Sequence, residues 1–194
     1  MIKHTMIAAA LAVSTSAVHA NTVIDFATLP QNTEVTTQYA GQGVTFRGLE
    51  DGGEVATVTA DFSSETGDRY LSNCYPTRCG SRADILEINF TEAASDVSWT
   101  LDSEGGLSIT FNAYDGGGAL LDTFDATGDG VIFGFGSLSG ISRIDALQPN
   151  DGWGWGLAKL TFESDVSAVP LPATLPLLAG AFGGLGLLRR RRKA

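Results

Sequence analysis

The sequence predicts an all-β fold, a β-sandwich, for most of this 194-residue chain. Apolar and polar residues alternate with a period of two along most of the body, as they do in strands that bury one face. Clusters of glycine, aspartate and asparagine separate these runs, which is typical of turns. No part of the body has the 3.6-residue period of a long helix. The length suits one domain, residues 21–168, with an end segment on each side, residues 1–20 and 169–194.

The first segment, residues 1–20, is predicted to be a signal peptide. Lys3 gives a polar start, and the apolar run from Met6 to Val13 is too short to span a bilayer. Val18 and Ala20 stand at the positions that a signal peptidase reads, so we expect cleavage after Ala20. A buried N-terminal helix is the alternative, which the strand pattern directly after Ala20 disfavours.

The body is expected to form about ten short strands. In the clearest run, Leu86, Ile88 and Phe90 face the core while the residues between them face water. Turn clusters such as Asp115–Gly118 and Thr127–Gly130 separate the runs. In chain order, the expected strands cover residues 22–27, 43–48, 54–60, 86–91, 96–101, 107–114, 119–125, 131–135, 141–147 and 157–162.

Three features of the body resemble extracellular jelly-roll domains of the carbohydrate-binding type. Val23–Phe26 opens the body, Tyr39–Phe46 reads YAGQGVTF, and a loop of tryptophan and glycine precedes the last strand. The resemblance implies a jelly-roll topology for the sandwich. In that family an aspartate often opens the final strand and helps to bind a structural calcium ion, whereas Gly156–Lys159 occupies this stretch here.

The last segment, residues 169–194, is predicted to hold a single transmembrane helix. The chain carries no charge from Leu171 to Leu188, a stretch that as a helix would be roughly 27 Å long, near the thickness of a bilayer core. Pro172 would kink a helix interior, so we expect the helix to run from Leu175 to about Arg190. The basic cluster that follows marks the cytoplasmic side and leaves the body outside the inner membrane.

The parts of this segment together resemble the PEP-CTERM class of sorting tails, in the variant written VPLPA-CTERM. The resemblance implies an exported protein of a Gram-negative bacterium that an exosortase recognises and cuts near the proline motif. It also implies anchorage in the inner membrane before processing and a place at the cell surface or in a biofilm matrix afterwards. An ordinary anchor that stays attached is the alternative. The residues that carry the resemblance are Val169, Pro170, Leu171, Pro172 and Ala173, the apolar run, and Arg189, Arg190, Arg191 and Arg192.

The charge of the body and its lack of histidine exclude several kinds of function. It holds all 22 acidic residues and six basic ones, a formal charge of −16, which argues against nucleic-acid binding. Both histidines lie in the predicted signal peptide, so Ser-His-Asp triads, Cys-His pairs and His-ligated zinc are excluded in the mature chain. Paired carboxylates remain available for glycoside hydrolysis, with Glu87, Glu92 and Glu104 as candidates by type alone. No spacing selects a pair, and we expect no enzyme.

Cys74 and Cys79 are predicted to form a disulfide bond, because an exported chain passes into an oxidising compartment. The loop that the bond would close is short, so we expect a stabilisation of about 2 kcal/mol.

Asp125 and Asp129 have two possible interpretations, a calcium site or turn residues. The stretch Asp125–Gly130 matches the first half of an EF-hand loop, but Gly136 stands where the bidentate glutamate should be. A looser site from the two aspartates is one interpretation, and turn acids that cap backbone amides are the commoner one.

The best candidate for a ligand is the loop with Asp151, Trp153 and Trp155. In an extended segment both indoles share one face and could stack on sugar rings, with Asp151 binding hydroxyl groups. The alternative, which we favour, is that one or both indoles fill the end of the core.

The leading hypothesis is therefore an exported, non-catalytic surface or matrix protein, sorted by its tail, that binds polysaccharide. A purely structural acidic surface component and a carbohydrate-active enzyme are the alternatives. The expected partners are signal peptidase, exosortase, the inner membrane and polysaccharide.

Overall fold

The computed structural model describes residues 18–50, 55–56, 58–62, 69–75, 81–103, 107–148 and 154–166. The proline motif, the predicted transmembrane helix and most of the predicted signal peptide lie outside these residues. Within them, no helix is long and apolar enough to cross a membrane. The described part is all-β, as predicted, and its helical elements are two single 3-10 turns.

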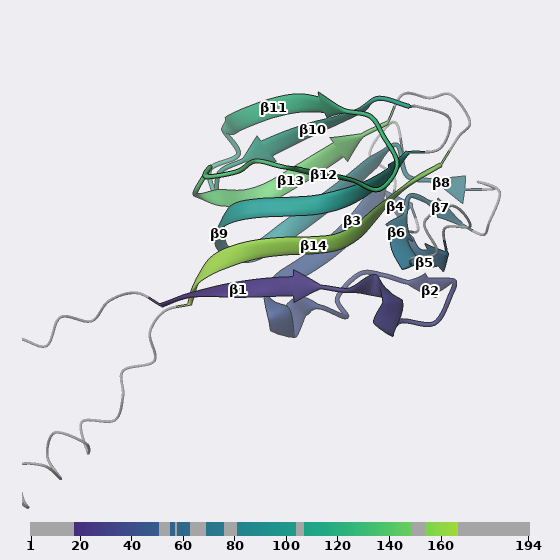
Figure 1. Ribbon diagram of the computed structural model, residues 1–194, viewed down its shortest axis with the longest axis horizontal. Coiled ribbons are helices and arrows are strands. Elements are labelled where there is room, and N and C mark those ends of the chain that lie inside the picture. Colours follow the sequence, from purple (N-terminus) through teal and green to yellow (C-terminus); the bar gives the residue numbers. More distant parts are fainter. Residues whose placement is uncertain are drawn as a thin grey trace, which may run out of the picture. The chain divides into compact units, whose positions relative to one another are not determined.

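The strands follow each other along the chain as in Figure 1. They are β1 (Val18–Ile24), β2 (Thr33–Glu34), β3 (Val44–Leu49), β4 (Val55–Ala56), β5 (Thr59–Phe62), β6 (Arg69–Ser72), β7 (Cys74–Tyr75), β8 (Ser81–Arg82), β9 (Ile85–Ser103), β10 (Ile109–Tyr114), β11 (Leu120–Ala126), β12 (Val131–Gly134), β13 (Ile141–Leu147) and β14 (Trp155–Val166). The two 3-10 turns are η1 (Phe26–Thr28) and η2 (Ala40–Gln42).

Strand β9 organises the sheet because it is long enough to serve two halves of it. Its first part, Ile85–Phe90, pairs with β3 and β13, and β10 and β11 follow beyond β13. Its second part pairs with β12 and β14, and β6, β5 and β2 follow beyond β14. We call these the β10 half and the β14 half. Together they form an open antiparallel sheet of 12 strands, and β7 and β8 pair separately.

Aromatic residues from both halves meet in one core. Trp99 of β9 lies 4.4 Å from Phe111 of β10, centroid to centroid, and Phe111 lies 6.0 Å from Trp155 of β14. Phe90 and Phe162 form another edge-to-face pair at 4.9 Å. Because side chains of the two halves face each other, the fold is consistent with a β-sandwich.

Two compensating bulges interrupt the pairing of β9 with β14. The register shifts by one residue between Ala158 and Thr161 and shifts back between Thr161 and Glu163. Lys159 of β14 and Asp96 of β9 lie at these shifts, and both have a left-handed backbone with φ of 50°. Each adds one unpaired residue to its strand, so the pairing regains its first register.

The bulges correct two details of the sequence prediction. Residues 86–91 and 96–101 were expected to be separate strands, but they are two parts of β9 joined through the bulge at Asp96. In the expected strand 157–162, a strict alternation that buries Leu160 would turn Leu157 to water. Leu157 is instead as fully buried as Leu160, because the alternation restarts at Lys159. Periodicity alone does not show where an extra residue enters a strand.

Most other expected strands are confirmed within two residues, but three differ. The strand expected at 157–162 continues to Val166 as part of β14. The stretch 22–27 ends as a strand at Ile24, because Asp25 caps η1 by accepting a hydrogen bond from the Ala27 N–H at 2.9 Å. The stretch 54–60 forms two strands, β4 and β5. Strands β2, β6, β7 and β8 were not predicted, and each has only two to four residues.

The start of β1 and the end of β14 lie at the same end of the sheet (Figure 1). The two strands pair with each other. The segments predicted to address the protein to a membrane therefore join the body at one end.

Candidate functional site

The outer surface of the β10 half carries an ordered array of polar side chains. Residues that alternate with the core residues of four neighbouring strands point away from the core. The registers set these residues in rows across the strands. We call this surface the polar face; it consists of Asn112 and Tyr114 of β10, Arg143 and Asp145 of β13, Glu87 and Asn89 of β9, and Thr45 and Arg47 of β3.

The polar face has two rows, and a third row lies beside it, from Thr110 through Leu147 and Ile85 to Leu49. The central one of these three rows holds two neighbouring carboxylates. Asp145 stands opposite Asn112 on one side and Glu87 on the other, and Glu87 stands opposite Arg47. The side chains of Asp145 and Glu87 are only 13% and 14% exposed. Crowding of this kind holds both carboxylates in place.

Two arginines balance these carboxylates. The Arg143 Nε lies 2.8 Å from the Asp145 Oδ1, and the Arg47 guanidinium lies 3.7 Å from the Glu87 Oε2. The arginine side chains are more exposed than their partners, at 37% and 52%. The polar face therefore presents two positive and two negative groups and has no formal charge of its own.

Arg143 also covers an aromatic ring. Its guanidinium carbon lies 4.6 Å from the centroid of the Tyr114 ring, which is cation–π distance. Arg143 stands directly opposite Tyr114 in the next row of the array. The polar face thus combines an oriented aromatic ring with hydrogen-bond donors and acceptors.

Burial affects the ionisation of Asp145. Loss of hydration raises the pKa of its carboxyl group above the ordinary value, with nearby Arg143 opposing the rise and Glu87 adding to it. The folded protein therefore holds a proton on Asp145 more readily than the unfolded chain does.

The two aspartates of the predicted calcium site serve separate hydrogen bonds. The Asp125 Oδ1 accepts one from the Thr110 hydroxyl at 2.6 Å, and the Asp129 Oδ1 accepts one from the Ser103 N–H at 2.9 Å. No group of three or more His, Cys, Asp or Glu side chains in the described ranges is placed to hold a metal ion. Calcium binding stays a prediction.

The predicted ligand loop is described only at Trp155. This indole is 2% exposed and packs in the core, edge-on to Phe111. Asp151 and Trp153 lie outside the described residues, as does Cys79 of the predicted disulfide. Glycan binding by the loop and the disulfide therefore stay predictions.

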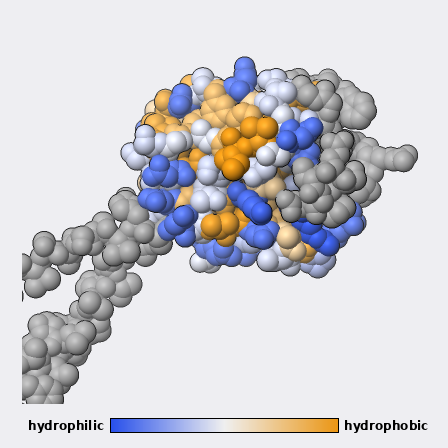
Figure 2. Space-filling view, viewed as in Figure 1, coloured by the Kyte–Doolittle hydropathy of each residue, from blue (hydrophilic) through white to orange (hydrophobic). Residues whose placement is uncertain are grey.

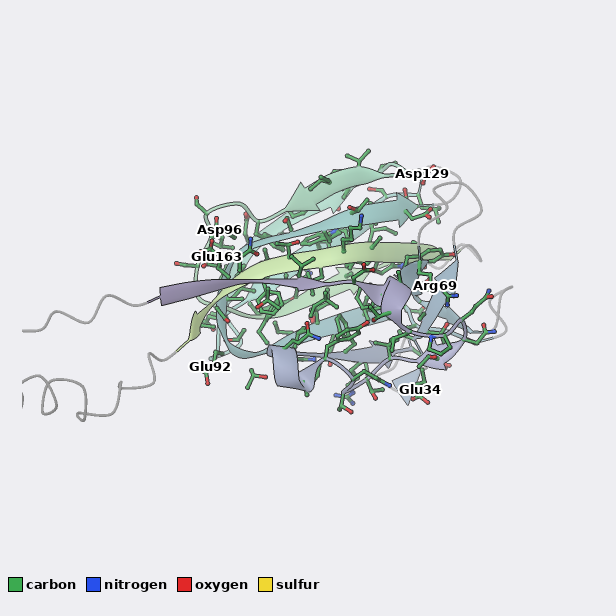
Figure 3. The ribbon with its side chains drawn as sticks, turned by 60° about the horizontal axis from the view of Figure 1, so that its bottom comes forward. Glu34, Arg69, Glu92, Asp96, Asp129 and Glu163 are labelled. Carbon is green, nitrogen blue, oxygen red and sulfur yellow. The ribbon has the colours of Figure 1, made fainter. Side chains whose placement is uncertain are left out.

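Several acidic residues, including Asp129 of the predicted calcium site, lie outside the polar face. Figure 3 shows Asp96 and Glu163 near the end of the sheet where β14 ends, and Asp129 at the opposite end. Of the three glutamates singled out by type, Glu87 lies in the polar face, Glu92 is exposed on β9, and Glu104 is outside the described residues. Only the first is placed opposite another carboxylate by the strand registers above.

A small apolar area lies on another part of the surface. Figure 2 shows it over β12, surrounded by polar residues. Val131 and Ile132 are 44% and 73% exposed there. These residues belong to the β14 half and are no part of the polar face.

Asn73 is a buried polar residue that no pattern in the sequence singles out. Its Nδ2 donates to the Ala83 carbonyl at 3.0 Å and to the Gln148 side chain, and its Oδ1 accepts from the Trp155 N–H at 3.0 Å. The side chain of Asn73 therefore connects three separate parts of the chain, at Ala83, Gln148 and Trp155. The many bonds within the protein assign it a structural role.

No protein-family model matches the chain, and no curated protein matches it either. Its function has to be argued from its own residues.

Proposed function

We propose that this chain is an exported, non-catalytic protein of the cell surface or extracellular matrix whose β body binds polysaccharide. Its tail, with Val169–Ala173 and the arginine cluster, directs it to an exosortase in the inner membrane. Processing there releases the body to the surface or the matrix. The resemblance of this tail to VPLPA-CTERM sorting segments supports the proposed route.

The observation that carries the binding role is the polar face. It is wide, balanced in charge, and rich in groups that bind hydroxyls, with one aromatic ring among them. Ligand sites that discriminate polar molecules need such fixed donors and acceptors.

The sorting part is tested by replacing the proline motif. In cells of the producing bacterium, Pro170→Ala/Pro172→Ala should keep the chain in the inner-membrane fraction with Arg189–Ala194 attached, as mass spectrometry of the fractions would show. Pro30→Ala, a proline change in the body, is the matched control and should leave release unchanged. Release of a wild-type chain that still carries the arginine cluster would refute processing.

A second function deserves a test because of the two carboxylates. Asp145 and Glu87 lie directly opposite each other on neighbouring strands, where Cβ atoms are about 4.5–5.5 Å apart. A glycoside hydrolase needs two such groups. Both carboxylates are close to arginines, which favours their role as fixed hydrogen-bond acceptors. Release of reducing ends from a polysaccharide by the wild type, lost in Glu87→Gln, would replace the binding role with catalysis.

A further inference from the structure

We propose that the polar face is the polysaccharide site and that its ligand is an uncharged polysaccharide lying across β10, β13, β9 and β3. That the ligand is a polysaccharide rests on the proposed function. The proposal adds where the polysaccharide binds, in which direction it crosses the strands, and that it carries no charge. Three features of the described residues support it: the width of the polar face, its charge balance, and the order in which rows of different chemistry lie side by side.

The width of the polar face favours a chain of several sugars over a single one. The central row crosses four strands, from Asn112 through Asp145 and Glu87 to Arg47. Neighbouring strands lie about 4.8 Å apart, so this row spans about 14 Å. The contact groups therefore lie along a line that crosses the strands, and a polymer can follow that line.

The three rows offer different chemistry side by side. One outer row is apolar except for Thr110 at its β10 end, with Leu147, Ile85 and Leu49 in register. The other outer row begins with Tyr114 and Arg143. The charged row lies between them. A sugar ring has apolar C–H faces and a polar rim of hydroxyls, so flanking apolar and aromatic groups with central hydrogen-bonding groups match it.

The charge balance selects an uncharged ligand. Arg143 and Arg47 each stand beside a carboxylate, so the polar face has no unpaired cation to attract an anionic polymer. The rest of the body carries a large excess of acidic residues, with 20 acidic against four basic. A polyanion would meet long-range repulsion at moderate ionic strength. Hydroxyl groups meet no such penalty, and the exposed edges of the mostly buried carboxylates are fixed acceptors for them.

The test is affinity electrophoresis of the full-length chain in mild detergent. Native gels contain hydroxyethyl cellulose, amylose or dextran as uncharged probes and alginate as the anionic probe. We expect retardation by at least one uncharged polymer and none by alginate. Tyr114→Ala and Asp145→Asn should each weaken binding roughly tenfold, as the loss of an aromatic contact or a charge-assisted hydrogen bond does. Tyr114→Phe keeps the ring and should bind like the wild type.

Asp122→Asn is the matched control for Asp145→Asn, because it also removes one carboxylate but lies exposed on β11 outside the polar face. It should bind like the wild type. Circular dichroism of each variant separates loss of the site from loss of the fold, and a misfolded Tyr114→Ala is replaced by Asn112→Ala.

Each part of the proposal can fail separately. Binding that survives Tyr114→Ala, Asn112→Ala and Asp145→Asn in folded proteins would overturn the location and leave polysaccharide binding standing. Retardation by alginate alone would overturn the charge class. If none of the four polymers retards the wild-type chain, both this inference and the proposed polysaccharide binding are wrong. The sorting route is tested separately, by the proline variants.

Discussion

Three buried hydrogen bonds meet at the side chain of Asn73, and they give a clear prediction of stability. Asn73→Ala leaves the Trp155 N–H, the Ala83 carbonyl and the Gln148 side chain without this partner inside the protein. We expect a loss of about 3 kcal/mol in the free energy of unfolding, measured by urea denaturation. Thr123→Val removes an exposed hydroxyl bond to Asn112 and should cost less than about 0.5 kcal/mol. Equal costs for the two variants would contradict the structural role of Asn73.

Asp145 predicts a pH dependence at the scale of one residue. Its pKa is raised in the folded state, mainly by burial, so its charged form opposes folding at neutral pH. This penalty disappears as the pH falls through the raised pKa towards the unfolded value. Asp145→Asn should therefore gain stability relative to the wild type at pH 7, and the gain should shrink towards pH 4. Thermal unfolding at several pH values checks this, and a gain that grows on acidification would disprove it.

At the scale of elements, the paired bulges make Lys159 a position with special backbone needs. Its φ of 50° is unfavourable for β-branched residues and acceptable for asparagine. Lys159→Ile should lower the free energy of unfolding by about 1–2 kcal/mol, whereas Lys159→Asn should leave it within about 0.5 kcal/mol. Both variants remove the same charge at an exposed site. The bulge would lose its assigned backbone role if the two variants were equally stable in urea.

The same elements show what sequence reasoning could reach. Runs such as 86–91 and 107–114 alternate cleanly, so their strands and buried faces were predictable. The polar face was not, because its members come from four strands and only the registers bring them together. Glu87 was singled out by type, but its partner Asp145 lies far along the chain and no local spacing relates the two. The short strands β2 and β7 carry too few residues for a period to be visible.

For the whole molecule, the acidic excess predicts a response to salt. After processing, the body has 22 acidic and six basic residues, and repulsion among them opposes the compact state. Sodium chloride should raise the melting temperature steadily between 0.01 and 1 M, because the screening length falls from about 30 to 3 Å. Magnesium and calcium chloride at equal ionic strength separate general screening from a specific site. A further rise with calcium alone, lost in Asp125→Asn/Asp129→Asn, would establish the calcium site that the sequence left open. Equal curves for the two divalent salts would assign these aspartates only to the bonds with Thr110 and Ser103.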